Sequence, residues 1–281
     1  MSKMSSAAIK AIIIPAIAAG MALTSCNGDK KAAEALREQA IAAIEVSDPA
    51  GALLLLDSID HAYPAQVETR RAAMPLRPKA IELSTLRDLE VTDSMLVQAQ
   101  VLMESMKDLV KLKKSADGID GYYVAASMSD AVPSSAEGLY ARMSPQGSFY
   151  IISSARKGTL STGITLSAQG VGEVSTPRVA CDGERNDRSM SAELITFLPA
   201  ESDTIGNFAF VNADRELTLT FNGERQQRSI KLPAAQAAAL AQLYAASQVY
   251  SRVSLLALRK EKLERTLMLA RSQQARTMPE Q

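Results

Sequence analysis

The sequence predicts an α+β protein in which a short helical hairpin precedes two long helices, with an antiparallel β domain inserted between the long helices. Two stretches, residues 79–114 and 234–276, contain neither proline nor glycine and repeat apolar residues at a heptad spacing. Between them, residues 118–233 change to short β-prone runs separated by Gly, Pro, Asn and Asp. The expected fold is therefore a coiled-coil stalk that carries a β-sandwich or barrel.

The first 25 residues have the features of a signal peptide. Lys3 and Lys10 give a positive start, and an apolar run from Ala11 to Leu23 follows. This run has the length of an h-region, roughly 7 to 15 residues. It is shorter than the ~20 apolar residues of a transmembrane helix. We expect residues 1–25 to be removed.

The end of this segment carries a motif for lipid attachment. The tetrapeptide Leu23-Thr24-Ser25-Cys26 resembles the lipobox of bacterial lipoproteins. The resemblance implies cleavage between Ser25 and Cys26, a diacylglyceryl thioether on Cys26, and a further acyl chain such as palmitate on the new amino group. Two or three chains anchor a protein stably, because each buried methylene contributes about 0.8 kcal/mol. The alternative is an ordinary secretory signal that ends in a cysteine by chance.

Residues 26–78 are expected to form a tether and a short helical hairpin. The tether is the polar segment 27–31, and the segment 32–45 places its apolar residues on one helical face. A second helix is predicted over 50–62, because Asp48 and Pro49 suit a helix start and Tyr63-Pro64 ends the pattern.

The two long helices are predicted over residues 79–117 and 234–276, with 277–281 as a disordered tail. The apolar row of the first is Leu89, Leu96, Met103 and Val110, flanked by Met95, Leu102 and Leu109 and completed by Ala99 and Met106. The row of the second is Val249, Val253, Leu256, Leu263, Leu267 and Ala270, interrupted at Lys260. Because a one-sided apolar stripe must be buried, we expect these helices to pair antiparallel. A helix of about 35 residues is ~50 Å long at 1.5 Å per residue.

The β domain is expected to occupy residues 118–233. Turn residues at a spacing of about 8 to 12 residues are typical of a sandwich or barrel. The predicted strands are 122–127, 139–143, 148–154, 161–168, 173–181, 193–198, 208–212, 216–221 and 227–232. Apolar and polar residues alternate over 216–221, and the dipeptide Asn222-Gly223 follows, which favours a hairpin with a type I′ turn.

The general plan of lipidated cysteine, short helices, coiled coil and β head, with phrases such as Leu56-Asp57-Ser58 and Tyr63-Pro64, resembles a class of lipoproteins of Gram-negative gut bacteria. That class has no assigned activity, so the resemblance implies location and architecture only. Asn27 does not match the Asp that retains enterobacterial lipoproteins at the inner membrane, and the tether lacks the acidic run linked with surface export. We expect an outer-membrane anchor facing the periplasm, with the cell surface as the alternative.

The composition argues against several kinds of partner. The chain has 31 Lys plus Arg and 31 Asp plus Glu, which gives no electrostatic case for nucleic acid. It has no Trp, 5 Phe and 7 Tyr, so it lacks the aromatic platforms on which sugars and bases stack. We expect no nucleic-acid partner and no cofactor.

No residue pattern predicts a catalytic or metal site. A histidine-based mechanism would have to use His61, the only His, which we expect at the surface or a hairpin interface. Cys181 is expected to be a small buried residue. The acidic loop 182–187 could offer oxygens to Ca²⁺, but it lacks the EF-hand pattern and is expected to be a solvated turn.

Two functions remain. The first is a lipid-anchored envelope protein that is not an enzyme, in which the stalk presents the β head to a protein partner or self-associates through the coiled coil. In the second, the β domain binds glycan or another exported polymer. The candidate platform for that polymer is Tyr122, Tyr123, Tyr140, Phe149 and Tyr150.

Overall fold

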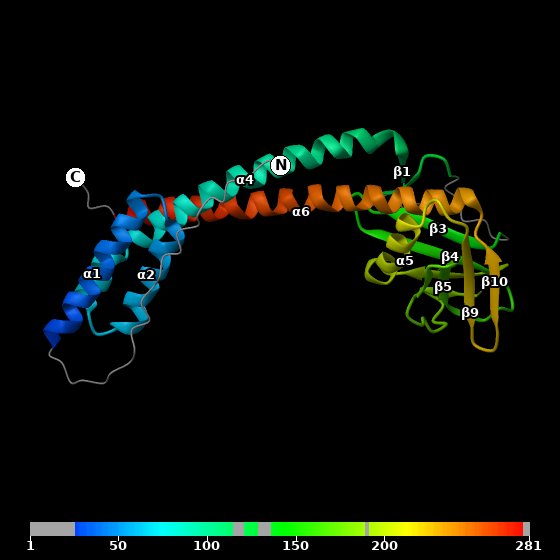
Figure 1. Cartoon of the computed structure of the whole chain (residues 1–281), viewed down its shortest axis with the longest axis horizontal. Coiled ribbons are helices and arrows are strands. Elements are labelled where there is room, and N and C mark those ends of the chain that lie inside the picture. Colours follow the sequence, from blue (N-terminus) through cyan, green and yellow to red (C-terminus); the bar gives the residue numbers. More distant parts are fainter. Residues whose placement is uncertain (1–25, 115–120, 129–135, 189–190, 278–281) are drawn as a thin grey trace, which may run out of the picture. The chain divides into compact units, whose positions relative to one another are not determined.

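The computed structural model describes residues 26–114, 121–128, 136–188 and 191–277, and it has an α+β fold with two antiparallel sheets (Figure 1). The chain divides into two compact units. The described part of the first comprises residues 26–84 and 270–277, and we call it the helical unit. We call the second, residues 85–269, the β unit. Leu23, Thr24 and Ser25 of the lipobox lie outside the described residues, as do residues 278–281 of the predicted tail.

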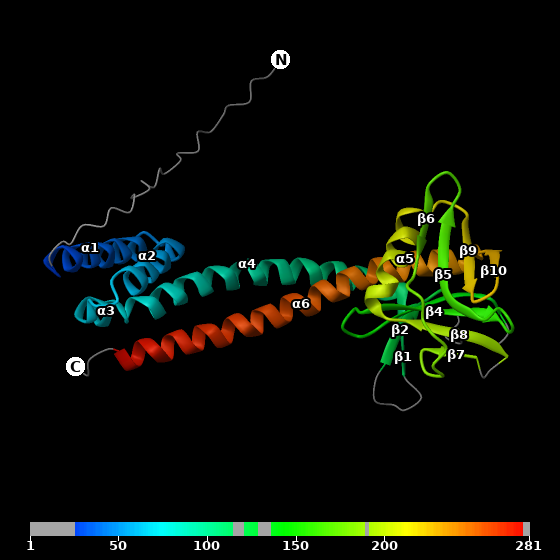
Figure 2. The same cartoon turned by 90° about the horizontal axis from the view of Figure 1, so that it is seen from below.

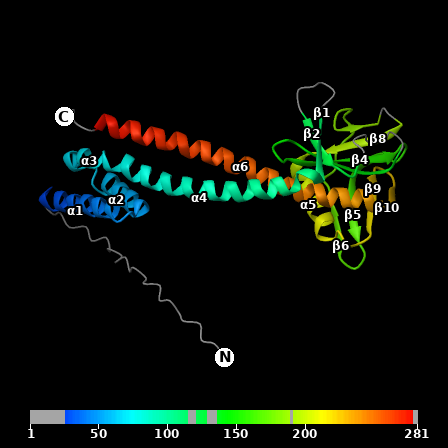
Figure 3. The same cartoon turned by 90° about the horizontal axis from the view of Figure 1, so that it is seen from above.

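The helical unit contains α1 (Cys26–Glu45), α2 (Pro49–Ala62), α3 (Val67–Ala73), the first residues of α4 (Leu76–Met106) and the last residues of α6 (Ala234–Thr277). Figures 2 and 3 show α1 and α2 side by side. Their apolar faces form two buried clusters. One consists of Ala40, Leu56, Ile59 and Ala73, and the other of Ile44, Ala52 and Ala80.

The two short predicted helices are present, but the predicted tether is not separate from them. α1 begins at Cys26, so residues 27–31 are helical. The alanine-rich sequence that follows favours a helix, and Asp29 in the first turn interacts well with the helix dipole. These two factors extend the helix through a polar segment that has no apolar stripe of its own.

The turn between α1 and α2 follows directly from the sequence Ser47-Asp48-Pro49. Ser47 adopts a φ of 57°, and the N–H of Asp48 donates to the carbonyl of Ala43 at 2.8 Å, which is the closing bond of a Schellman motif. The Asp48 carboxylate then accepts the N–H of Gly51 at 3.0 Å, and Pro49 is the first residue of α2. One short segment thus ends one helix and begins the next.

The first long helix is shorter than predicted. α4 ends at Met106, and a 3₁₀ turn over Lys107–Leu109 leads into strand β1 (Val110–Lys114), where the heptad pattern predicted a helix to residue 117. Residues 110–113 alternate apolar and basic side chains, so they satisfy a strand period as well as a helical one. Antiparallel pairing of β1 with β2 (Gly121–Ala125) decides between the two.

Within the β unit, most of the predicted heptad positions are buried or half-buried, although the predicted Leu109 is 41% exposed and other positions of α6, such as Tyr250, are buried as well. In α4 the protected heptad positions are Leu89, Leu96, Ala99, Met103 and Met106, together with the fully buried Thr92. In α6 they are Val249, Val253, Leu256, Lys260, Leu263 and Leu267. Leu102, predicted to flank the row, is 51% exposed. The Nζ atom of Lys260 lies 2.8 Å from an oxygen of Asp93, which joins the two helices by an ion pair.

The described strands form two separate antiparallel sheets and no closed barrel. Sheet A has the order β1-β2-β3-β4-β8-β7, and sheet B has the order β10-β9-β5-β6. The remaining strands of sheet A are β3 (Gly138–Met143), β4 (Phe149–Arg156), β7 (Asn186–Asp187) and β8 (Ala192–Phe197). The strands of sheet B are β5 (Ser161–Ala168), β6 (Gly172–Ser175), β9 (Leu217–Gly223) and β10 (Gln227–Lys231).

One predicted strand is helical. Residues 208–212 fall at the end of helix α5 (Pro199–Val211). Pro199 suits the first turn of this helix, and the Glu201 carboxylate accepts the N–H of Leu198 at 2.7 Å. The apolar residues 208–211 resemble a strand only when the helix start upstream of them is not recognised.

The hairpin of β9 and β10 forms where predicted, but its turn lies further along. Asn222 pairs with Gln227, and the N–H of Gly223 donates to the carbonyl of Gln226 at 3.0 Å, so Glu224 and Arg225 form the turn. Gly223 is required for a different reason, since a Cβ atom there would lie 2.2 Å from the carbonyl oxygen of Thr159.

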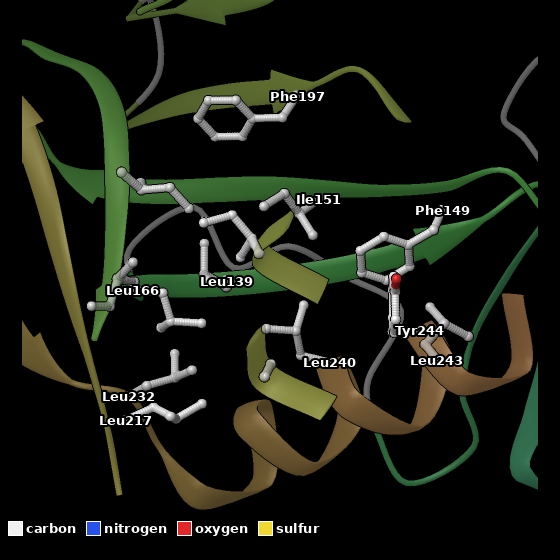
Figure 4. Close-up of a cluster of buried hydrophobic side chains, with 14 of the residues drawn as sticks. Leu139, Phe149, Ile151, Leu166, Phe197, Leu217, Leu232, Leu240, Leu243 and Tyr244 are labelled. Carbon is white, nitrogen blue, oxygen red and sulfur yellow. The ribbon is translucent and has the colours of Figure 1, made fainter. Parts of the chain in front are cut away.

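The core of the β unit combines both sheets with α5 and the first half of α6 (Figure 4). Leu139, Ile151 and Phe197 come from sheet A, and Leu166 and Leu217 come from sheet B. Leu240, Leu243 and Tyr244 of α6 complete the same cluster, and the Phe149 and Tyr244 rings meet edge to face at 5.3 Å.

None of the helices in the described part of the chain has the length and apolar character needed to cross a membrane.

Candidate anion-binding groove

The helical unit has a cavity of about 720 Å³ between α2, α3, the start of α4 and the last turns of α6. Its polar side chains are four arginines, one aspartate, a glutamine and a threonine, and the rest of its surface is apolar. The lining residues are Leu56, Asp60, Val67, Arg70, Arg71, Ala73, Met74, Arg77, Pro78, Gln273, Arg276 and Thr277. We call this cavity the arginine groove.

The short helix α3 brings the cationic side chains together. It lies between the turn at Tyr63-Pro64 and Pro75, so the chain reverses twice within a few residues. Arg70 and Arg71 lie in its last turn, where positive charge is favourable to the helix dipole. Arg77 follows in the first turn of α4, and Arg276 arrives from the end of α6.

Two of the four arginines are engaged by carboxylates of α2. The Nε atom of Arg70 and the Nη2 atom of Arg77 each lie 3.0 Å from an oxygen of Asp60. The Nη1 atom of Arg77 also lies 2.7 Å from Asp57. The hydrogen bond from Arg70 holds the pKa of Asp60 below its ordinary value of 3.8, so this carboxylate stays ionised around neutral pH.

The other two arginines have no such partner. Arg71 and Arg276 are exposed, and no ion pair joins either of them to another residue of the described part of the chain. Among the described residues, the groove therefore has four guanidinium groups, and only two carboxylates, Asp57 and Asp60, pair with them. A guanidinium group presents five N–H donors in a planar fork, which suits carboxylate and phosphate oxygens.

The apolar part of the groove is partly open to solvent. Val67 and Met74, at the two ends of α3, are 59% and 65% exposed. Residues spaced by three, four and seven lie on one face of a helix, so Val67, Arg70, Arg71 and Met74 share a face of α3. The arrangement can therefore bind an anionic group that carries an apolar portion.

The predicted aromatic platform is divided by the fold. Tyr140 and Phe149 are buried, and the Tyr123 ring packs edge to face on Tyr250 at 5.2 Å. Tyr122 and Tyr150 lie apart from that core with Arg142, whose guanidinium group is 4.2 Å from the centre of the Tyr122 ring. Arg142 is paired with Tyr150 across β3 and β4. The five predicted residues thus do not form one surface.

The other residues considered from sequence have local roles. A carboxylate oxygen of Asp182 accepts the N–H groups of Glu184, Arg185 and Asn186 at 2.9 to 3.0 Å, which organises the acidic loop as a turn. No group of three or more metal-ligating side chains occurs among the described residues. His61 is exposed and its Nδ1 atom lies 2.8 Å from the carbonyl oxygen of Asp57.

Cys181 corrects an expectation, because it is exposed and not buried. It lies in the irregular segment between β6 and β7, where Val179 rather than Cys181 enters the core. The expectation rested on the general tendency of free cysteine to be buried and on a strand predicted over 173–181. The observed β6 ends at Ser175, so the strand does not extend to Cys181.

The arginine groove itself was missed by sequence reasoning. The local density of cations in residues 70–77 is visible in the sequence, but Arg276 is separated from it by almost the whole chain. Only the fold brings the two segments together. No protein-family model, curated protein or solved structure matches the chain.

Proposed function

We propose that this protein is a lipid-anchored component of the bacterial cell envelope that acts by binding a partner and not by catalysis. The observation that carries the binding role is the pair of unpartnered arginines, Arg71 and Arg276, in the arginine groove. The proposed anchor, Cys26, is the first residue of α1 in the same unit. The groove would then lie in the part of the protein that is tethered to the membrane.

We further propose that α4 and α6 pair as an antiparallel coiled-coil stalk and that sheets A and B form a sandwich-like head. The protected heptad rows of both helices and the Lys260–Asp93 ion pair support the pairing. A charged residue at a heptad position costs stability but fixes the register of two helices when a partner is within reach. In this proposal the stalk presents the head to a partner.

The anchor is tested by mass spectrometry of the mature amino terminus. Acyl chains on Cys26 would support the proposal, and an unmodified thiol would overturn it. Protease treatment of intact cells then distinguishes two locations. A protein that faces the periplasm from the outer membrane, as proposed, is protected, whereas a protein on the cell surface is cleaved.

The binding role is tested by cross-linking in native membranes. We expect a cross-linked partner, either a lipid or a protein, that is lost in the variant Arg71→Glu/Arg276→Glu and kept in Arg252→Glu/Arg259→Glu. The control makes the same change of charge at two exposed arginines of the β unit. Recovery of the protein alone in every case, or equal loss in both variants, would contradict a role for the groove.

A second candidate function is polymer binding by the β unit. The specific observation in its favour is the stack of Arg142 on Tyr122 beside Tyr150, which leaves a small amphipathic surface of partly exposed side chains on sheet A. A glycan array probed with the chain from residue 26 onward, and with its Tyr122→Ala variant, tests this function. A blank array, or binding unchanged by Tyr122→Ala, would remove it.

A further inference from the structure

We infer that the arginine groove binds the phosphate-bearing headgroup of an anionic phospholipid, with Val67 and Met74 against the apolar part of the membrane interface. This inference deepens the proposed function and rests on it for the presence of a membrane beside the helical unit. The groove would then bind lipid headgroups by its own side chains, in addition to the membrane attachment that the acyl chains on Cys26 provide.

The number and origin of the arginines favour phosphate over a carboxylate. A carboxylate is planar and has only two oxygens, and Asp60 shows that two guanidinium groups, those of Arg70 and Arg77, already occupy both of them. The two cations that no described carboxylate engages come from different elements, Arg71 from α3 and Arg276 from α6, and they lie in the same cavity as Arg70 and Arg77. Donors that approach from several directions suit a tetrahedral group with several acceptor oxygens.

The exposed apolar residues favour a lipid over a free anion. A surface that binds only a soluble phosphate gains nothing from exposing Val67 and Met74 beside its cations. At a membrane interface the same combination is favourable, because apolar side chains enter the acyl boundary while arginines contact anionic headgroups. The volume of about 720 Å³ is also within the range of small-molecule sites, about 300 to 1,000 Å³.

The inference is tested by co-sedimentation of the chain from residue 26 onward, carrying Cys26→Ser, with lipid vesicles. All described residues are retained and no acyl anchor is present, so the result does not depend on lipidation. We expect binding to vesicles that contain phosphatidylglycerol in phosphatidylcholine, weakened by salt, and little binding to phosphatidylcholine alone. Equal binding to both kinds of vesicle would overturn the inference.

The groove is distinguished from diffuse attraction by matched variants. Arg71→Ala/Arg276→Ala should weaken binding about 30-fold, since each cation near an anionic surface contributes roughly fivefold. Arg252→Ala/Arg259→Ala, which removes the same charge from the β unit, should leave it nearly unchanged. Neither pair has an ion-pair partner among the described residues, so thermal unfolding should be unaffected in both. Equal weakening by the two variants would show that the groove is not the site.

Two further arms identify the source of the anion. The Val67→Ser/Met74→Ser variant should lose vesicle binding while its arginines remain. If glycerol phosphate in solution binds the groove but vesicles do not, the ligand is a free phosphate ester and the inference is wrong. If an acidic peptide displaces vesicles more strongly than glycerol phosphate does, the site is for a protein and the inference is equally wrong. A missing acyl group on Cys26 would instead overturn the anchor alone.

Discussion

Glu193 is a buried carboxylate that accepts three backbone N–H groups. It is 1% exposed, and its two oxygens accept the N–H groups of Gly158, Leu160 and Ser161 at 2.8, 3.1 and 2.8 Å. Leu160 has a φ of 55°, a conformation that costs a branched residue roughly 1 to 2 kcal/mol. The carboxylate therefore stabilises the strained turn between β4 and β5.

We predict that Glu193→Ala lowers the free energy of unfolding by about 3 kcal/mol or more. The substitution leaves the buried N–H of Ser161 without an acceptor, which costs about 1 to 3 kcal/mol, and it removes the bonds to two partly buried donors and the support of the strained turn. Glu193→Gln keeps one acceptor oxygen and should lose less. Urea unfolding followed by circular dichroism measures both variants. A neutral Glu193→Ala would mean that water replaces the carboxylate at this turn.

Glu137 makes the stability of the β unit depend on pH. Its carboxylate accepts two hydrogen bonds from Arg228, at 2.6 and 2.7 Å, and these hold its pKa below the ordinary value of 4.5. A lowered pKa in the folded state contributes stability above the unfolded value and loses it as pH falls through the folded pKa. We predict that stability declines below about pH 4.5 and that Glu137→Gln makes the decline shallower.

Urea midpoints measured across that pH range test the prediction. The matched control is Glu173→Gln, because Glu173 is exposed on β6 and no ion pair joins it to another described residue. The control should follow the parent chain. If the stability of Glu137→Gln fell with decreasing pH as steeply as that of the parent chain, other carboxylates would govern the pH dependence of stability.

At this scale the sequence identified the turn residues better than the functional ones. Asp48 and Pro49 act locally, so their roles could be predicted from adjacent positions. Glu193 could not be recognised, because a glutamate in an alternating strand has the appearance of a solvent-facing residue. The N–H groups that donate to it come from a hairpin more than thirty residues earlier, and only the fold brings them within reach.

Among the elements, α4 contains a buried hydroxyl at the centre of its protected row. Thr92 is fully buried, and its Oγ1 atom has no hydrogen-bond partner among the described residues. A buried hydroxyl without a partner costs about 1 to 3 kcal/mol in protein mutational data. Valine has nearly the same shape and no hydroxyl group.

We predict that Thr92→Val raises the free energy of unfolding by about 1 kcal/mol. Thr204→Val, at an exposed position of α5, is the control and should change it little. Thermal unfolding of the three chains compares them. A Thr92→Val variant that is less stable than the parent would mean that the hydroxyl binds a group on another molecule or an ordered water.

The elements also show where periodicity is informative and where it is ambiguous. The heptad rows were predictable over long windows, because many residues repeat the same spacing. Short segments that fit two periods were not, and both errors, β1 and the end of α5, are of this kind. In each case a distant interaction decides, namely the pairing of β1 with β2 and the packing of α5 on the core of the β unit.

For the molecule as a whole, the division into two units means that there are separate hydrophobic cores. Each unit buries its own apolar clusters, and no described cluster contains residues of both. The arginine groove belongs to the unit with the smaller clusters. The cluster of arginines in this groove could not be predicted from composition, because the near balance of charge in the whole chain hides the local excess of arginine.

We predict that the two units respond separately to core substitutions. Ile59 and Ile195 are both fully buried, the first in the helical unit and the second in the β unit. Truncation of either to alanine should cost about 2 to 5 kcal/mol locally. In hydrogen exchange, Ile59→Ala should reduce the protection of α1 and α2 and leave β4 and β8 protected, and Ile195→Ala should do the reverse. If each substitution lowered protection equally in both units, the chain would unfold as one cooperative unit. Local unfolding of the helical unit, which contains the groove, would then require unfolding of the β unit as well.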